Sequence, residues 1–138
     1  ILIVFSSPTN NEIFYLIFGV LVYLVGLVTE IIADYQKTIH NRLNNKKREF
    51  ISSGLWSRSR HPNYFGEFLI WTGITIICFP VFLGFKYLAF ITPIFIYYLL
   101  NYISGVNLLE ERAKEKWGKD PEYVKYLKTT PKFFPKIF

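Results

Sequence analysis

The stretch IFYLIFGVLVYLVGLVT, residues 13–29, contains no charged side chain and decides the fold class. Two more uncharged stretches follow it, at residues 68–85 and 87–109. Each can cross the hydrocarbon core of a bilayer as a helix of about 20 residues. The sequence therefore predicts an all-α fold, a polytopic transmembrane helical bundle, with spans near residues 12–34, 65–84 and 87–109.

The composition supports a membrane protein. Of 138 residues, 51% are hydrophobic, 20% are aromatic and only 19% are charged, which is too apolar for a solvated protein of this size. We expect one membrane domain over residues 1–138, with a tight hairpin at residues 84–86 between the second and third spans. Pro80 and Pro93 are tolerated as kinks, because neighbouring helices can satisfy the freed carbonyl groups.

The basic residues are distributed by side of the membrane. Seven lie between Lys37 and Arg60, and eight lie between Arg112 and Lys136, whereas the opposite side holds only Lys86. By the positive-inside rule, the loop at residues 35–62 and the tail at residues 110–138 are cytoplasmic. This topology accounts for the net charge of +6 better than a nucleic-acid partner does.

Cysteine and histidine are too few for a disulfide framework or a metal site. Cys78 is the single cysteine, and neither histidine has neighbouring ligands for zinc. The chain begins without methionine, and residues 1–5 resemble the end of an earlier apolar helix. We therefore expect the C-terminal part of a larger protein that has further helices upstream.

The first helix is predicted from about residue 11 to residue 38, and one of its faces is polar toward the cytoplasmic end. At 100° per residue, Glu30, Asp34 and Lys37 share that face with Tyr23 and Gly26. Carboxylates at this depth are costly, which favours a polar cavity. For Lys37, a solvated position at the helix end is an alternative.

The third span has a polar stripe as well, and it is followed by a tail with two short helices. The stripe includes Asn101 and Glu111, and hydrogen bonding between helices is an alternative explanation for Asn101. We expect an amphipathic helix from Ala113, a break at residues 118–121, and a second helix at residues 122–128. The aromatic end of the tail either folds back over a cytoplasmic pocket or lies on the membrane.

Arg-His-Pro-Asn-Tyr-Phe-Gly-Glu, residues 60–67, is the start of the second span. Proline suits the first turn of a helix, so the N–H groups of this turn lie beside Arg60 and His61 and predict an anion site. Glu67 follows Asn63 by one turn, deeper in the apolar zone, where it is suited to proton donation. Trp56, just before this start, is either an interfacial anchor or part of the site.

The three cytoplasmic helix ends, near residues 30–37, 60–67 and 107–112, are predicted to meet at one depth and form a shared pocket. Its cations suit phosphate, and its aromatic rings suit stacking on a ring, so a nucleotide-like cofactor is the economical ligand. The sequence has neither a Gly-x-Gly-x-x-Gly motif nor a P-loop. From the residues alone, the prediction is a membrane enzyme with an anionic cofactor.

Four ordered blocks resemble the C-terminal domain of the steroid 5-alpha-reductase family, most closely its bacterial-type branch known as domain of unknown function 1295. The resemblance covers nearly the whole chain. The blocks are Glu-Ile-Ile-Ala-Asp-Tyr-Gln-Lys at 30–37, Gly-Leu-Trp-Ser-Arg-Ser-Arg-His-Pro-Asn-Tyr-Phe-Gly-Glu at 54–67, Ser-Gly at 104–105 with Leu-Glu-Glu-Arg at 109–112, and Lys-Trp-Gly-Lys-Asp-Pro-Glu-Tyr at 116–123 followed by Thr-Pro at 130–131.

The resemblance implies a multi-span bundle that binds NADPH from the cytoplasmic side and delivers hydride to a conjugated carbon–carbon double bond of a sterol or other lipid. Asn63 and Glu67 match the family's cofactor-contacting Asn-x-x-Gly-Glu motif, with Glu67 as the catalytic candidate. Residues that polarise the substrate are expected upstream of this chain. The full set expected to bind the cofactor is Asp34, Lys37, Trp56, Arg60, His61, Asn63, Tyr64, Glu67, Glu111, Arg112 and Tyr123.

Two other functions stay open. Isoprenylcysteine and phospholipid methyltransferases have a similar Arg-His-Pro-x-Tyr-x-Gly helix start and a Glu-Glu pair, here Glu110 and Glu111. Their pocket would hold S-adenosylmethionine, with Arg60 or the helix N-terminus on its carboxylate. The Gly-Glu ending at Glu67 and the Ala-Asp-x-Gln-Lys block resemble reductases instead. A non-enzymatic membrane protein that binds lipid or nucleotide is the third possibility.

Overall fold

The computed structural model describes residues 9–44, 49–81 and 88–136, and all regular structure in these ranges is helical, which confirms the all-α class. Two of the elements are short 3₁₀ turns and one is a π-helix. In chain order the elements are α1 (Asn10–Asn44), η1 (Gly54–Ser57), α2 (Pro62–Cys78), η2 (Phe79–Val81), α3 (Ile91–Tyr98), the π-helix η4 (Leu99–Ser104), α4 (Val106–Trp117) and α5 (Pro121–Thr129).

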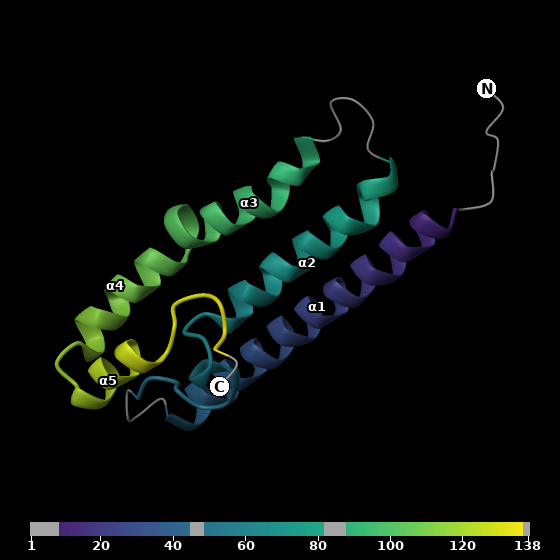
Figure 1. Cartoon of the computed structure of the whole chain (residues 1–138). Coiled ribbons are helices and arrows are strands. Elements are labelled where there is room, and N and C mark those ends of the chain that lie inside the picture. Colours follow the sequence, from purple (N-terminus) through teal and green to yellow (C-terminus); the bar gives the residue numbers. More distant parts are fainter. Residues whose placement is uncertain (1–8, 45–48, 82–87, 137–138) are drawn as a thin grey trace.

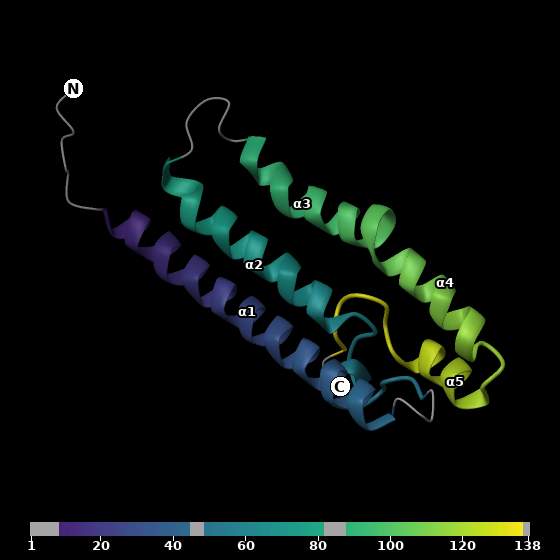
Figure 2. The same ribbon diagram turned by 180° about the vertical axis from the view of Figure 1, so that it is seen from behind.

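Three long helical rods lie side by side (Figures 1 and 2). They are α1, α2, and the continuous path from α3 through η4 to α4. The short helix α5 and the last described residues gather near the start of α2 and the end of α1. The loops and the tail that carry most of the charge are therefore at one end of the bundle.

The helices α1 and α2 share the most extensive contact in the fold, and glycines permit their close approach. A Cβ atom built on Gly73 would lie 2.6 Å from the backbone nitrogen of Tyr23 and 2.8 Å from the carbonyl oxygen of Gly19. A Cβ atom on Gly66 would lie 2.7 Å from the backbone nitrogen of Glu30. Small residues let helix backbones meet directly in this way, as is typical of helix pairs in membranes.

Two helical stretches are long and apolar enough to cross a membrane, namely Asn10–Asn44 and Leu88–Trp117. The outward side of α1 and much of α3 expose large hydrophobic side chains, in keeping with a lipid environment. The 17 residues of α2 span about 25 Å at the usual rise per residue, slightly less than a bilayer core. A crossing by α2 therefore stays a prediction, and the expected hairpin at residues 84–86 falls outside the described residues.

One predicted helix boundary is wrong. α1 continues to Asn44 and not to residue 38, since no helix breaker intervenes. The third span, residues 87–109, stays a prediction. The helical path through its described part is interrupted by η4 and by Gly105, after which α4 continues to Trp117. The amphipathic helix expected from Ala113 is thus the second half of α4.

The break before α5 and the position of α5 are confirmed. Asp120 caps the helix by accepting a hydrogen bond from the backbone of Glu122 at 2.9 Å, and Pro121 occupies the first turn. These two devices fix the start of α5 at the predicted break.

The aromatic end of the tail folds back onto the segment that leads into α2, and whether it also lies on the membrane stays a prediction. The Ser59 hydroxyl donates to the Phe133 carbonyl at 2.7 Å, and the Arg60 N–H donates to the Pro131 carbonyl at 2.9 Å. The Phe133 ring is buried and packs edge-on against Phe68. The tail therefore fastens the segment that leads into α2.

Candidate functional site

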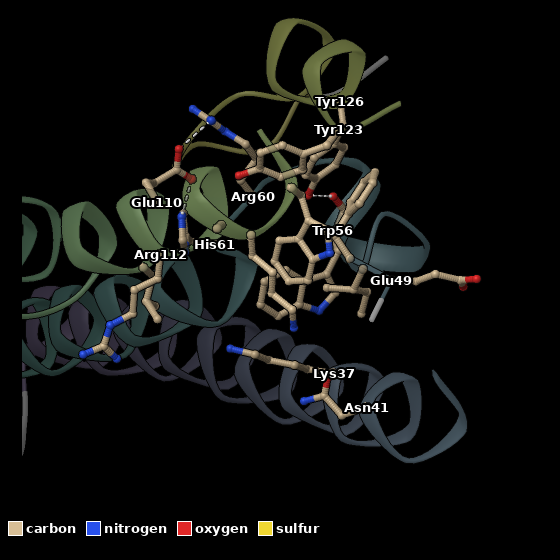
Figure 3. Close-up of a pocket in the computed structure, with 16 residues that line it drawn as sticks. Lys37, Asn41, Glu49, Trp56, Arg60, His61, Glu110, Arg112, Tyr123 and Tyr126 are labelled. Carbon is tan, nitrogen blue, oxygen red and sulfur yellow. Dashed lines mark hydrogen bonds and ion pairs between the residues drawn. The ribbon is translucent and has the colours of Figure 1, made fainter. Parts of the chain in front are cut away.

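A cavity of about 280 Å³ lies at this end of the bundle, between α1, the segment at residues 49–61, α4 and α5 (Figure 3). Lys37 and Asn41 from α1 lie on one side, and Tyr123 and Tyr126 from α5 lie on the other. Four cations and two carboxylates reach the cavity, and five aromatic rings line it. They are Lys37, Arg60, Arg112 and Lys116, then Glu49 and Glu110, then Phe50, Trp56, Trp117, Tyr123 and Tyr126.

An ion cluster closes one end of the cavity. One carboxylate oxygen of Glu110 accepts from Arg60 Nη1 at 2.7 Å, and the other pairs with His61 Nε2 at 2.8 Å. The Arg60 and Glu110 side chains are only 15% and 13% exposed, so water screens this pair weakly. Glu110 thereby connects α4 to the start of α2.

His61 is held largely in its neutral form. Burial lowers its pKa from the ordinary 6.5, and this outweighs the hydrogen bond and the charge of Glu110, which act in the opposite direction. Because an ionised carboxylate can only accept, the neutral ring must carry its proton on Nε2, where it donates to Glu110. The other ring nitrogen, Nδ1, is then an acceptor.

Trp56 is buried within the wall of the cavity, and residues of two helices, α1 and α5, hold it. Its Nε1 donates to the Ala33 carbonyl of α1 at 3.0 Å, and its own carbonyl accepts from the Tyr126 hydroxyl of α5 at 2.6 Å. Lys37 Nζ lies 5.2 Å from the centre of its ring, within cation–π range. Burial raises the pKa of Tyr126, so its hydroxyl stays protonated as this donor.

The cavity unites six of the eleven residues predicted to bind the cofactor. These are Lys37, Trp56, Arg60, His61, Arg112 and Tyr123. The other five do not line it, so the structure does not place the whole predicted set in one pocket. They are Asp34, Asn63, Tyr64, Glu67 and Glu111.

Four of the remaining five lie on α1 and α2, next to the cavity. The Tyr64 ring stacks on His61 with the ring centres 5.9 Å apart, and Glu67 is one turn further along α2. Asp34 is exposed on α1, close enough to interact electrostatically with Tyr64. Glu111, the fifth, is exposed on α4.

Two buried polar atoms in the described part of the chain have no hydrogen-bond partner. They are the Nε donor of Arg60, whose side chain reaches the cavity, and the Oδ1 acceptor of Asn63 on the first turn of α2. A buried polar group without a partner costs about 1–3 kcal/mol, so a bound ligand with matching groups would relieve the cost. Both atoms belong to residues that the sequence had singled out.

The prediction of an open anion site on Arg60 and His61 needs correction. The Glu110 carboxylate already occupies both side chains. The expected stripe on the third span gave Glu111 the inward position, but the π-helix and the break at Gly105 reset the helical phase before α4 begins. Glu110 therefore points inward and Glu111 outward.

Sequence reasoning missed several residues of the cavity. Glu110 entered only as half of a Glu-Glu pair, and Phe50 was not considered because nothing in a loop marks a residue as inward-facing. Tyr126 follows Tyr123 by three residues on an amphipathic helix, which was a usable signal. Within the described residues, no group of three or more histidine, cysteine, aspartate or glutamate side chains could hold a metal ion.

Comparison with known proteins gives a family and one distant relative. The family described as "Protein of unknown function (DUF1295)" matches residues 1–130. A probable 7-dehydrocholesterol reductase of Acanthamoeba polyphaga mimivirus is 28% identical over 139 residues, which cover 86% of this chain and 29% of the relative. The chain thus spans less than a third of the length of that protein.

No solved structure was found to match the chain. The family match extends over all the elements that build the cavity, from α1 to α5. The chain therefore belongs to the DUF1295 family.

Proposed function

We propose that the protein is a membrane-embedded reductase that uses NADPH to reduce a conjugated carbon–carbon double bond in a sterol or other lipid. The likeness to a probable 7-dehydrocholesterol reductase supports the reaction class and the lipid substrate. The observation that supports the choice of cofactor is the cavity, which combines four cations with five aromatic rings at the charged end of the bundle.

The residues of the cavity fit one half of a dinucleotide. Lysine and arginine suit phosphate oxygens, and aromatic rings suit stacking on a base. A volume of about 280 Å³ is just below the range for small-molecule pockets, roughly 300–1,000 Å³, so it suits a part of NADPH better than the whole. We assign the adenosine and phosphate groups to the cavity, with Lys37, Arg112 and Lys116 as their cations.

The reactive half of the cofactor then lies toward Asn63 and Glu67, along the first turns of α2. NADPH, when bound, supplies the hydride. Asn63 offers a buried acceptor, Oδ1, that suits the amide hydrogens of the nicotinamide. Reduction of a double bond needs hydride on one carbon and a proton on the other, and Glu67 is the candidate to supply or hold that proton.

The methyltransferase alternative is less well supported, for one geometric reason. Arg60 or the N-terminus of the helix would hold the carboxylate of S-adenosylmethionine, and of these two Arg60 already holds Glu110 at 2.7 Å. A protein that binds lipid or nucleotide without catalysis is an outcome that the same experiment resolves.

Titration of the protein in detergent with NADPH and with S-adenosylmethionine tests the proposal. We expect saturable binding of NADPH, and oxidation of NADPH when a conjugated sterol is added to the complete protein. Binding of S-adenosylmethionine alone would overturn the reductase assignment. Binding of NADPH without turnover on any conjugated lipid would support the non-enzymatic alternative.

Two substitutions test the assigned residues. Asn63→Ala and Glu67→Ala are each expected to weaken NADPH binding by about tenfold, roughly 1.4 kcal/mol, while expression in the membrane is retained. Glu115→Gln, on the exposed side of α4, is the control and should bind as the wild type does. Unchanged affinity in both alanine variants would remove Asn63 and Glu67 from the site.

A further inference from the structure

Glu110 occupies a place that a ligand anion would otherwise take. Both of its carboxylate oxygens accept from side chains of its own chain, the Arg60 guanidinium at 2.7 Å and the His61 ring at 2.8 Å (Figure 3). These partners are 50 and 49 residues away in the sequence, so the contact fixes the third helical rod against the start of α2. Of the Glu-Glu pair, Glu110 is therefore the carboxylate that bonds to other side chains of the protein, whereas Glu111 is exposed to solvent.

The partners of Glu110 are held from other directions as well. The Arg60 N–H donates to the Pro131 carbonyl at 2.9 Å, and the His61 N–H donates to the Ser59 hydroxyl at 3.2 Å. The backbone at this point is therefore set by the tail and by a local turn, while the direction of the two side chains is set by Glu110. Without Glu110, the Arg60 guanidinium could swing and the His61 ring could turn over.

The direction of these side chains determines what they offer to a ligand in the cavity. With Nη1 bound to Glu110, Arg60 keeps its buried Nε without a partner beside the cavity. With Nε2–H bound to Glu110, the neutral His61 ring has Nδ1 as an acceptor and stacks on Tyr64. One carboxylate thus sets the donor and acceptor pattern at the junction between the cavity and the first turn of α2.

We infer that Glu110 is a positioning residue, which orients Arg60 and fixes the Nε2–H tautomer of His61 so that both side chains are preorganised for the ligand. In this role Glu110 acts through Arg60 and His61. The identity of the ligand rests on the proposed function, but the positioning of His61 by Glu110 does not.

The first arm of the test measures NADPH affinity in the detergent-solubilised protein. Glu110→Gln is expected to weaken binding by about tenfold, which corresponds to roughly 1.4 kcal/mol. Glu115→Gln makes the same chemical change one and a half turns further along α4, on an exposed side chain, and should leave the affinity unchanged. Equal affinity in the wild type and Glu110→Gln would overturn the inference for the ligand site.

The second arm reads the His61 ring directly, by NMR of ¹⁵N-histidine in a His40→Gln background, in which His61 is the single histidine. The wild-type ring should show the Nε2–H tautomer. Glu110→Ala removes the acceptor and should shift the population toward Nδ1–H. If that variant does not fold, Glu110→Asp keeps the charge but shortens the reach, and should shift the population in the same direction.

The two arms separate the inference from the function. An unchanged tautomer in the folded Glu110 variants would overturn the positioning role, whatever the ligand is. A wild-type protein that fails to bind NADPH would overturn the proposed function, while a tautomer shift would still support the role of Glu110.

Discussion

His61 should make the stability of the protein depend on pH. Its pKa is lowered in the folded state, mainly by burial and also by the charges of Arg60 and Lys37, with Glu110 opposing. The unfolded chain therefore binds more protons between the folded-state pKa and the ordinary value of 6.5. Stability is fully present above pH 6.5 and falls as the pH drops through this window. We expect a lower thermal midpoint at mildly acidic pH than at neutral pH.

The two histidines allow a matched comparison. His61→Gln should flatten the dependence of the thermal midpoint on pH in this window, whereas His40→Gln retains His61 and should keep the dependence. A pH profile that is the same in the wild type and in His61→Gln would show that His61 does not titrate in this way.

The sequence was informative about the kinds of residue at the site and less so about their partners. The charged and aromatic residues near Arg60, together with helical periodicity, correctly predicted that Lys37, His61 and Arg112 lie at the same end of the bundle. They could not show that Glu110 neutralises the cluster. Its direction depends on the π-helix Leu99–Ser104 just before α4, and its partners Arg60 and His61 are 50 and 49 residues away in the chain. Local sequence patterns predict which residue types lie at a site, whereas three-dimensional contacts decide which of the charged groups are still available to bind a ligand.

The interface between α1 and α2 should be sensitive to a single methyl group. Gly73→Ala places a Cβ atom against the backbone of Tyr23 and Gly19, which cannot yield as a side chain could. Overpacking of this kind costs about 1–3 kcal/mol, more than the gain of up to about 1 kcal/mol in helix propensity. We expect the variant to have a lower thermal midpoint than the wild type, as measured by circular dichroism in detergent.

Val25→Leu is the control for this change, since it adds a methylene group to an exposed side chain of α1 and should alter stability by less than about 0.5 kcal/mol. A Gly73→Ala variant as stable as the wild type would mean that the two helices do not approach this closely.

The regular parts of the elements followed from the sequence, and the irregular parts did not. Long uncharged runs located α1, and Asp120 with Pro121 located α5. The π-helix Leu99–Ser104 has no marker in the sequence, because its residues are compatible with an ordinary helix. Gly105, which follows it, leaves room for Tyr64, whose hydroxyl oxygen lies 2.8 Å from where a Cβ atom would be.

At the scale of the molecule, the predicted three-span topology would place the two ends of the described chain on opposite sides of the membrane. In a Cys78→Ser background, Lys128→Cys should react with an impermeant thiol reagent from the cytoplasmic side only, and Asn10→Cys from the other side only. Both residues are exposed at helix ends. Labelling of both from the same side would contradict the three-span topology.

The cavity itself offers the most direct test of the central claim, because two of the three tryptophans, Trp56 and Trp117, line it and can transfer excitation energy to the reduced nicotinamide of NADPH. A Trp71→Phe background leaves only these two donors. The account predicts that NADPH, added to this protein in detergent, quenches tryptophan emission and gains sensitised emission that saturates with concentration. Tryptophan emission unaffected by NADPH, in protein shown to be folded, would contradict the claim that the cavity binds the cofactor.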